Sequence, residues 1–239
     1  MAELRVISSG SQGNSYIIEC EKETLLAELG VPFSDIMSSL NYNIPKVVGA
    51  IVSHQHQDHA NKGTIAKMLK YGIPVYSCEE AAHENKGVTI VKKGRKTSIG
   101  GFKIQPIPLQ HSVQCFGFLV EHDEFGRLVF ATDCSSFPYL IKNVNHFLIE
   151  CNWSEDVLID NMCNNEEMRS RHEQHLELEN TVMALSANYS SSLQTILLLH
   201  LSNGNSNAEM FKNRVKEELG FFNVHIAEKG LTLQLQDDF

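Results

Sequence analysis

The sequence predicts an α/β fold in a single domain that spans residues 1–239. The chain is 42% apolar and 21% charged, which is ordinary for a globular protein long enough to bury a sizeable core. Short β-type runs alternate with turns through the first half, and helical patterns stand between and after them. No Pro-rich or Gly/Ser-rich linker and no internal repeat divides the chain, so strands and helices are expected to pack as layers of one unit.

The individual elements follow from hydrophobic periodicity and turn residues. Strands are expected at residues 4–8, 15–20, 24–28, 47–53, 74–77, 89–92, 102–108, 117–121, 127–132 and 147–150. Helices are expected at residues 34–40, with Ser34 as the cap, and at 61–70, 79–83 and 166–188. The chain is expected to close with a buried strand at 195–200, a helix at 208–219 and strands at 223–227 and 231–234.

Composition excludes several classes of protein. No apolar run approaches the ~20 residues that a membrane span needs, and the N-terminus lacks the features of a signal peptide, so a cytoplasmic location is expected. Six cysteines without a C-x-x-C pair are interpreted as free thiols. The net charge of −9 argues against a basic, whole-surface nucleic-acid binder, and residues 120–239 carry eight Lys/Arg against nineteen Asp/Glu.

An H-x-H-x-D-H motif follows the apolar strand expected at residues 47–53; it is formed by His54, His56, Asp58 and His59. At this chain's own His and Asp frequencies, the four fixed positions arise by chance in about one such sequence in a thousand. Residues two apart in an extended loop point the same way, so His54 and His56 can bind one metal together. Asp58 and His59 stand at the expected start of the next helix, where they can face a second metal.

Further ligands are expected where later apolar strands stop. His111 and Asp133 follow two of these strands, and His200 ends another. A carboxylate can bridge two cations, so we expect Asp133 to be shared between two sites, one formed by His54, His56 and His111, the other by Asp58, His59 and His200. Two metals ~3.5–4 Å apart activate water and hold both oxygens of a displacement. The mixed imidazole and carboxylate ligands favour two zinc ions, with manganese as the second choice.

These residues resemble the metallo-β-lactamase superfamily, whose five motifs are matched in order by Glu28, residues 54–59, His111, Asp133 and His200. The resemblance covers essentially the whole chain, and it implies a four-layer αββα sandwich with a dinuclear site at one edge of the two sheets. The first motif usually has an aspartate followed by glycine two residues on. Here Gly30 is kept but Glu28 replaces the aspartate, so whether Glu28 takes over its supporting role is left open.

The superfamily hosts several reactions, so local residues must select one. Phosphodiester cleavage expels a poor alkoxide, and a positioned general acid then contributes ~10²–10⁴-fold. Glu150 and His175 resemble a pair in ribonuclease Z and the WalJ/YycJ-type exonucleases, in which a carboxylate orients a histidine that protonates the leaving oxygen. His175 departs from that pattern because Gln174 stands where a glycine is usual, and His172 competes for the same role.

Three further residues are candidate substrate contacts. Ser11 and Asn14 belong to an S-S-G-S-Q-G-N-S run at residues 8–15, which resembles the N-terminal loop of the WalJ-type group. Ser202 belongs to a His-Leu-Ser-Asn run that resembles the last motif of the same group. A plain hairpin turn and the end of a core strand are the alternative interpretations of these two runs.

The leading hypothesis is a dinuclear-metal phosphodiester hydrolase, specifically a nuclease resembling DNA exonucleases. Asp58 is expected to orient or deprotonate a metal-bound hydroxide, and His175, held by Glu150, to protonate the leaving group. The first alternative is a cyclic-nucleotide phosphodiesterase of the same fold, which suits the acidic chain. The second is a lactone, thioester or β-lactam hydrolase. DNA, RNA and a small nucleotide therefore all stay open as substrates, no membrane partner is expected, and the sequence does not define the oligomeric state.

Overall fold

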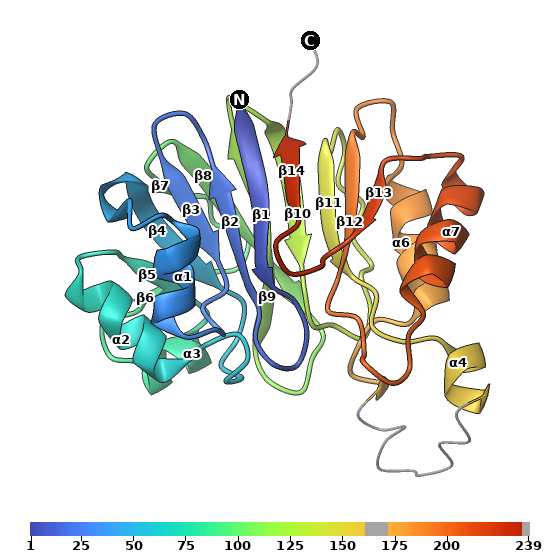
Figure 1. Ribbon diagram of the computed structural model, residues 1–239, viewed down its shortest axis with the longest axis horizontal. Helices are drawn as coiled ribbons and strands as arrows, with labels where there is room; N and C mark the ends of the chain where they lie inside the picture. Colours follow the sequence, from blue (N-terminus) through green and yellow to red (C-terminus); the bar gives the residue numbers. More distant parts are fainter. Residues whose placement is uncertain (161–171, 236–239) are drawn as a thin grey trace.

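Two mixed β-sheets pack face to face, with helices on both outer faces (Figure 1). The computed structural model describes residues 1–160 and 172–235. This is the expected αββα sandwich, and the fold prediction is confirmed. The first sheet has the order β14-β1-β2-β3-β4-β5-β6, formed by Thr232–Leu235, Ala2–Ser8, Ser15–Glu19, Thr24–Ala27, Val47–Val52, Val75–Ser77 and Thr89–Ile90. The second has the order β13-β12-β11-β10-β9-β8-β7, formed by Val224–Ile226, Thr195–Leu199, His146–Glu150, Gly126–Ala131, Cys115–His122, Phe102–Leu109 and Thr97–Ile99.

Strand direction brings the candidate ligands to one edge. Strands β3 to β6 are parallel in the first sheet, and β10 to β13 are parallel in the second. Strand β9 is antiparallel to both of its neighbours, so β8 runs the same way as β10. The carboxyl ends of β8, β10, β11 and β12 therefore lie at the same edge of the sheet, where ligands of open α/β sheets collect.

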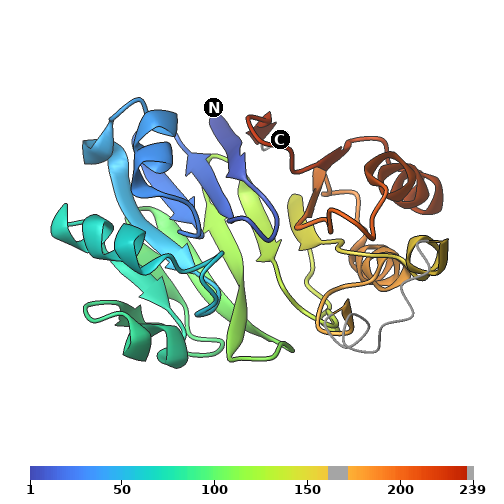
Figure 2. The ribbon, with the colours of Figure 1, turned by 60° about the horizontal axis from the view of Figure 1, so that its bottom comes forward.

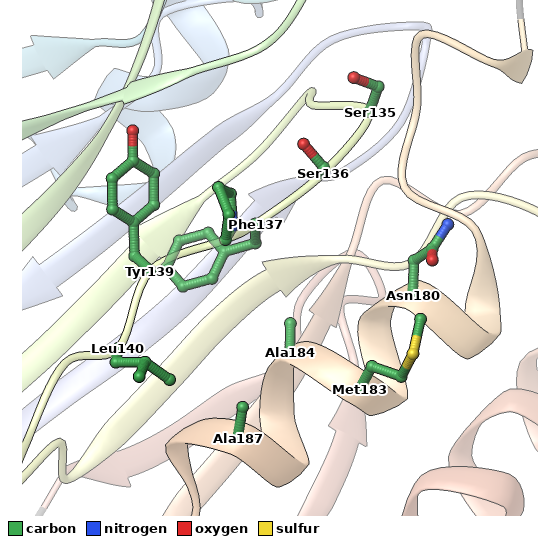
Figure 3. Close-up of a pocket in the computed structure, with 10 residues that line it drawn as sticks. Ser135, Ser136, Phe137, Tyr139, Leu140, Asn180, Met183, Ala184 and Ala187 are labelled. Carbon is green, nitrogen blue, oxygen red and sulfur yellow. The ribbon is translucent and has the colours of Figure 1, made fainter.

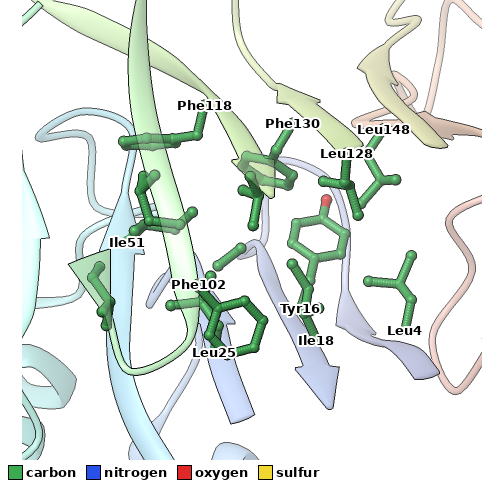
Figure 4. Close-up of a cluster of buried hydrophobic side chains, with 14 of the residues drawn as sticks. Leu4, Tyr16, Ile18, Leu25, Ile51, Phe102, Phe118, Leu128, Phe130 and Leu148 are labelled. Carbon is green, nitrogen blue, oxygen red and sulfur yellow. The ribbon is translucent and has the colours of Figure 1, made fainter. Parts of the chain in front are cut away.

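Three apolar layers hold the sandwich together. The inner one lies between the sheets and includes Tyr16, Phe102, Phe118 and Phe130 (Figure 4). Two outer layers lie beneath the helices: one under α1 (Phe33–Ser39) and α2 (Lys62–Lys70), the other under α6 (Leu178–Asn188) and α7 (Ala208–Leu219). Figure 2 shows that the two helix groups lie on opposite sides of the sheets. The first group also includes α3 (Glu79–Glu84).

The prediction of one helix over residues 166–188 is wrong in part. Residues 173–177 form a turn and an extended stretch, and α6 begins at Leu178; residues 166–171 lie outside the described residues. The cause is a pairing with the chain beyond β11, because the Asn152 N–H donates to the Leu176 carbonyl at 2.8 Å. The Glu177 carboxylate then caps α6 by accepting from two backbone N–H groups.

The sequence patterns did not predict several short elements. Strand β7, the short helix α4 (Glu155–Asp160) and a 3₁₀ turn at Ile44–Lys46 were not expected. All are six residues or shorter, which leaves little periodicity to detect. The five described cysteines are free and buried, while Cys163 lies outside the described residues. No helix in the described ranges combines the length and apolar character needed to cross a membrane.

Candidate metal centre and acid pair

The H-x-H-x-D-H motif occupies the loop between β4 and α2. Two backbone contacts shape it: the N–H groups of His59 and Ala60 both donate to the carbonyl of His56. Asn61 caps α2, since its side chain accepts from the Thr64 N–H at 3.1 Å. Asp58 and His59 therefore lie in a tight turn before the helix, which directs their side chains back toward the sheet edge.

His54, His56 and His111 converge through one ring nitrogen each. His56 Nδ1 lies 3.0 Å from His54 Nε2 and 3.3 Å from His111 Nε2. Nitrogens bound tetrahedrally to one zinc at 2.0–2.1 Å are about 3.3 Å apart, so the spacing fits a shared ion. Ser53 Oγ lies 2.8 Å from His54 Nδ1, and the Gln174 carbonyl lies 3.1 Å from His111 Nδ1. Such outer contacts orient imidazole ligands.

Asp58, His59, Asp133 and His200 form the second cluster, their ligand atoms all lying within 4.8 Å of one another. Asp133 Oδ1 lies 3.2 Å from His59 Nε2 and 3.6 Å from His200 Nδ1. Asp58 Oδ2 lies 3.4 Å from His59 Nε2 and 3.6 Å from His200 Nε2. The rings of His54 and His59 are 4.3 Å apart, which places the two clusters side by side.

The charges and unpaired atoms of these clusters fit divalent metal ions. His200 Nε2 is buried and has no hydrogen-bond partner, yet it faces Asp58. Burial lowers the pKa of His54 well below its usual range, which keeps the ring neutral, as a ligand must be. Burial would also lower the pKa of His200, but the Asp133, Asp58 and Glu150 carboxylates together outweigh it and raise the pKa to about 10. The second cluster therefore attracts positive charge strongly.

Glu28 supports this centre from the end of β3. It is fully buried and has a left-handed backbone with φ of 64°. Its carboxylate accepts from the Ser53 N–H at 3.2 Å and lies 3.6 Å from His59 Nδ1. His200 also has a positive φ, of 54°, and strained backbone of this kind clusters at functional sites. The longer glutamate therefore reaches both the strand end and the histidine.

Gly30 and Asn14 hold the loop that carries Asp58 and His59. A Cβ on Gly30 would lie 1.7 Å from the Asp58 carbonyl oxygen, so only glycine permits this approach. The Asn14 amide nitrogen lies 3.2 Å from that same oxygen and 3.0 Å from His59 Nε2. Asn14 has no exposed surface. The side chain is enclosed by the loop that it positions, and this structure shows no exposed atom of Asn14 for the substrate contact that the sequence suggested.

Glu150 and His175 form a close contact beside the second cluster. His175 Nδ1 lies 2.6 Å from Glu150 Oε1, and the same oxygen lies 3.1 Å from His200 Nδ1. The other carboxylate oxygen accepts from the N–H groups of Cys134 and Leu176 at 2.8 and 3.0 Å. Burial lowers the pKa of a histidine, but the charge and hydrogen bond of Glu150, together with the Asp133 charge, outweigh it and raise the pKa of His175. The contact through Nδ1 leaves Nε2 as the nitrogen that can face a substrate.

The short segment before α6 fixes His175 by its backbone. Trp153 Nε1 donates to the His175 carbonyl at 3.1 Å, and the Leu178 N–H donates to the Trp153 carbonyl at 2.8 Å. The Gln174 contact with His111 uses only the backbone, and Gln174 is not among the residues with positive φ. Geometry at this position therefore does not demand the glycine that the family pattern usually has there.

The other candidate residues have different surroundings. His172 does not contact Glu150; its Nε2 lies 2.7 Å from Asn205 Nδ2, and its ring is 5.8 Å from that of Trp153. The Ser202 hydroxyl accepts from the Asn205 N–H at 3.3 Å, so it organises its own loop. Ser11 is exposed at the tip of its turn.

Sequence reasoning missed two positioning contacts. The amide nitrogen of Asn152 donates to the His200 carbonyl at 2.6 Å, which orients this ligand. Trp153 supports His175 through the bond from its ring nitrogen to the His175 carbonyl. Their positions two and three residues after Glu150 were the only available signal, because both contacts join segments more than twenty residues apart.

A cavity of about 310 Å³ lies outside the two ligand clusters and the Glu150–His175 pair, none of which lines it (Figure 3). It begins two residues after Asp133 and lies between the segment 135–140 and α6. Ser135, Ser136 and Asn180 give it polar groups, and apolar side chains such as Leu140 and Met183 line the remainder. Ligand sites in proteins combine apolar walls with a few polar groups in this way.

The sandwich fold, the paired His/Asp clusters at its edge and the adjacent Glu–His pair define a metal-dependent hydrolase. The chain belongs to the beta-lactamase superfamily domain family, whose model matches residues 32–200. This family implies divalent metal binding, and the resemblance that the motifs predicted is confirmed.

Individual relatives agree with this assignment. An exodeoxyribonuclease YycJ of Bacillus anthracis is 24% identical over 271 residues, covering 97% of each chain. The metallo-beta-lactamase fold protein YhfI of Bacillus subtilis is 17% identical with a TM-score of 0.76, covering 98% of this chain and 100% of that one. The short form of human tRNase Z is 13% identical with a TM-score of 0.68, covering 98% and 99%. The two structures are similar to this chain in fold.

Proposed function

We propose that this protein is a dinuclear-metal phosphodiesterase, and specifically a nuclease that acts on DNA. The observation that carries the proposal is the 2.6 Å contact between His175 Nδ1 and Glu150 Oε1 beside the two ligand clusters. A hydrolase that expels an amine or a stabilised leaving group has less need of such an acid than one that expels an alkoxide. The similarity to exodeoxyribonuclease YycJ over nearly the whole chain supports DNA as the substrate.

The seven candidate ligands are proposed to hold two ions. His54, His56 and His111 would hold one, Asp58, His59 and His200 would hold the other, and Asp133 would be shared between them. Zinc is the first choice and manganese the second, because the set combines imidazole and carboxylate without thiolate. When bound, the ions polarise the scissile phosphate and lower the pKa of water toward 7.

The chain's own residues supply the proton transfers. His200 and His59 outweigh the burial of Asp58 and hold the pKa of its carboxyl well below its usual range, so Asp58 is an acceptor throughout the neutral pH range. We assign to Asp58 the orientation of the attacking oxygen. Glu150 keeps His175 protonated, and His175 Nε2 gives its proton to the departing alkoxide oxygen. Asp58 and His175 both lie near Asp133: Asp58 shares a cluster with it, and His175 Nδ1 lies 3.7 Å from Asp133 Oδ2.

A cyclic nucleotide is the second candidate substrate, and the charge of the chain favours it. The formal net charge is −9, and two divalent ions would bring it only to about −5. The dense basic cluster at residues 92–96 is partly neutralised, because Lys96 pairs with Glu121 at 2.8 Å. A small substrate needs no basic track along the protein surface.

One panel of assays separates these possibilities. The protein is loaded with Zn²⁺ or Mn²⁺ and incubated with linear duplex DNA, single-stranded DNA, RNA and cyclic nucleotides, with Asp133→Ala as the blank. The proposal predicts metal-dependent release of nucleotides from DNA that the blank does not show. Hydrolysis of cyclic nucleotides without cleavage of DNA or RNA would favour the second candidate, a cyclic-nucleotide phosphodiesterase, over the nuclease. Turnover of a lactone or thioester with no phosphodiester cleaved would overturn both.

A further inference from the structure

A groove crosses the outer face of the second sheet. It consists of two adjoining cavities of about 310 and 420 Å³, and Tyr139 and Leu140 line both of them (Figure 3). The smaller cavity begins at Ser135, whose N–H donates to the Gln110 carbonyl at 2.9 Å. Gln110 directly precedes His111, so this end of the groove lies against the loop that carries a candidate metal ligand.

The other end of the groove is basic. Lys93, Arg127 and Lys142 line the larger cavity, and none of its lining residues is acidic, although the chain has a net charge of −9. Arg127 is paired with Glu121 at 3.3 Å. Lys93 and Lys142 are exposed, and neither side chain forms an ion pair within residues 1–160 and 172–235. Their two ammonium groups are therefore available to an anion.

Hydrogen bonds fix the wall that carries Lys142. The Tyr139 hydroxyl donates to the Pro108 carbonyl at the end of β8, at 2.5 Å. The Asn188 side chain in α6 donates to the Tyr139 carbonyl at 2.9 Å, and the Arg127 guanidinium in β10 donates to the Lys142 carbonyl. Because this wall is held by two strands and a helix, the groove is formed before any ligand binds.

The opposite wall is the turn that carries Lys93, and it lies along the edge of β8. The Gly94 N–H donates to the Pro106 carbonyl at 3.0 Å. Pro106 lies five residues before His111, so at most about 16 Å of extended chain separates this contact from the candidate ligand. A stacked nucleic-acid strand rises about 3.4 Å per nucleotide, and about five nucleotides span this distance.

The surface between the two lysines is apolar. Leu140 exposes 76% of its surface, and Tyr139 and Ile141 on either side of it are half-buried. Sites for single-stranded nucleic acid combine basic groups that follow the phosphates with flat or apolar groups that meet the faces of the bases. In a duplex those faces are covered by neighbouring bases. The composition of the groove therefore fits a single strand.

We propose that the groove between Lys93 and Lys142 binds the DNA strand whose scissile phosphate lies at the candidate metal centre. This inference rests on the proposed nuclease function and adds to it a binding site for nucleotides that are not cleaved. The phosphates meet the two lysines, and the bases pack against Leu140 and Tyr139. A cyclic nucleotide or a dinucleotide is too short to reach the lysines, so the groove favours longer strands.

Substrate length separates the groove from the active site in an assay. Metal-loaded wild type and Lys93→Gln/Lys142→Gln are compared on a ten-nucleotide DNA strand and on a dinucleotide. Loss of two phosphate contacts lowers the slope of log K against log salt by about 1.4, so we expect KM for the longer strand to rise by about 10–30-fold at 0.1 M salt. We expect kcat, and the rate on the dinucleotide, to stay unchanged.

The matched control is Lys70→Gln/Lys86→Gln. It makes the same change of charge at two exposed lysines, one at the end of α2 and one after α3, on the opposite outer face of the sandwich. Only the general field of the protein changes there, so KM should shift by less than about threefold. An unchanged KM in the groove variant, or an equal rise in the control, overturns the proposal.

A binding measurement decides the proposal even if no DNA is cleaved, an outcome that would count against the nuclease function alone. Fluorescence anisotropy of the labelled ten-nucleotide strand, with chelator present, gives the affinity of each protein. The groove variant should bind about 10–30-fold more weakly than wild type at 0.1 M salt. Equal affinities would overturn the groove, and a duplex whose binding depends on the two lysines to the same extent would overturn the assignment to a single strand.

Discussion

Removal of the His175 imidazole is the sharpest test of the proposed mechanism. His175→Ala takes away the group 2.6 Å from Glu150 but leaves the ligands of both clusters in place. Glu150 keeps its bonds from the Cys134 and Leu176 N–H groups and its contact with His200, so the surrounding structure is expected to persist. The loss of activity then reports the role of the imidazole itself.

The expected size of the loss follows from what a general acid supplies. A positioned acid contributes ~10²–10⁴-fold, which corresponds to about 3–5 kcal/mol of transition-state free energy. The acid matters only when the departing oxygen is a strong base. We therefore expect a loss of this size in kcat on an ordinary phosphodiester and a far smaller one on a nitrophenyl ester, whose leaving group departs without a proton.

The assay compares kcat of wild type, His175→Ala and His172→Ala on both substrates at a fixed metal concentration. His172 is the matched control, because it lies three residues away and contacts Asn205 and Trp153 in place of Glu150. Metal content is measured for each variant. Equal losses on the two esters in His175→Ala, with metal retained, would refute the leaving-group role.

Three further predictions concern other parts of the structure. Glu28→Gln should keep the bond from Ser53 N–H but weaken metal binding about 10–100-fold, measured by competition with a chelator, since the charge beside His59 is lost. Gly30→Ala should lower bound metal and destabilise the fold by at least about 1–3 kcal/mol, because the added Cβ meets Asp58 backbone; metal analysis and urea unfolding measure both. Burial lowers the pKa of His146 to about 4, so His146 should contribute a loss of about 2 kcal/mol of unfolding free energy between pH 7 and 5, measured as the difference between the pH dependences of metal-free wild type and His146→Leu.

The controls for these predictions come from the same chain. Gly63→Ala, in the first turn of α2, introduces the same methyl group without a positive φ or a backbone clash and should leave metal content unchanged. The pH prediction has a definite sign. The unfolded histidine binds a proton below about pH 6.5 and the folded one only below about pH 4. The contribution of His146 to stability therefore decreases as the pH is lowered through that window. Equal pH dependence in wild type and His146→Leu would contradict the prediction for His146. Unchanged metal affinity in Glu28→Gln would contradict the prediction for Glu28.

Much of the site was predictable because its signals are local. The H-x-H-x-D-H motif lies within six residues, and His111, Asp133 and His200 each follow an apolar strand. Parallel strands end at a common edge, so residues far apart in sequence were expected to meet there. The helix at 166–188 was mispredicted in part because a pairing between residues 152 and 176 overrides local propensity at 173–177.

The sequence by itself determined the fold class and the residue types that gather at the sheet edge, because hydrophobic periodicity and strand ends are encoded over a few residues. Only the tertiary structure decided that Asn14 is enclosed and that Gln174 supports His111 through its backbone. It alone brought Cys20 within 3.4 Å of His122, across 102 residues of chain. Contacts of this kind depend on strand register and on how the two sheets face each other, and no short stretch of sequence specifies either.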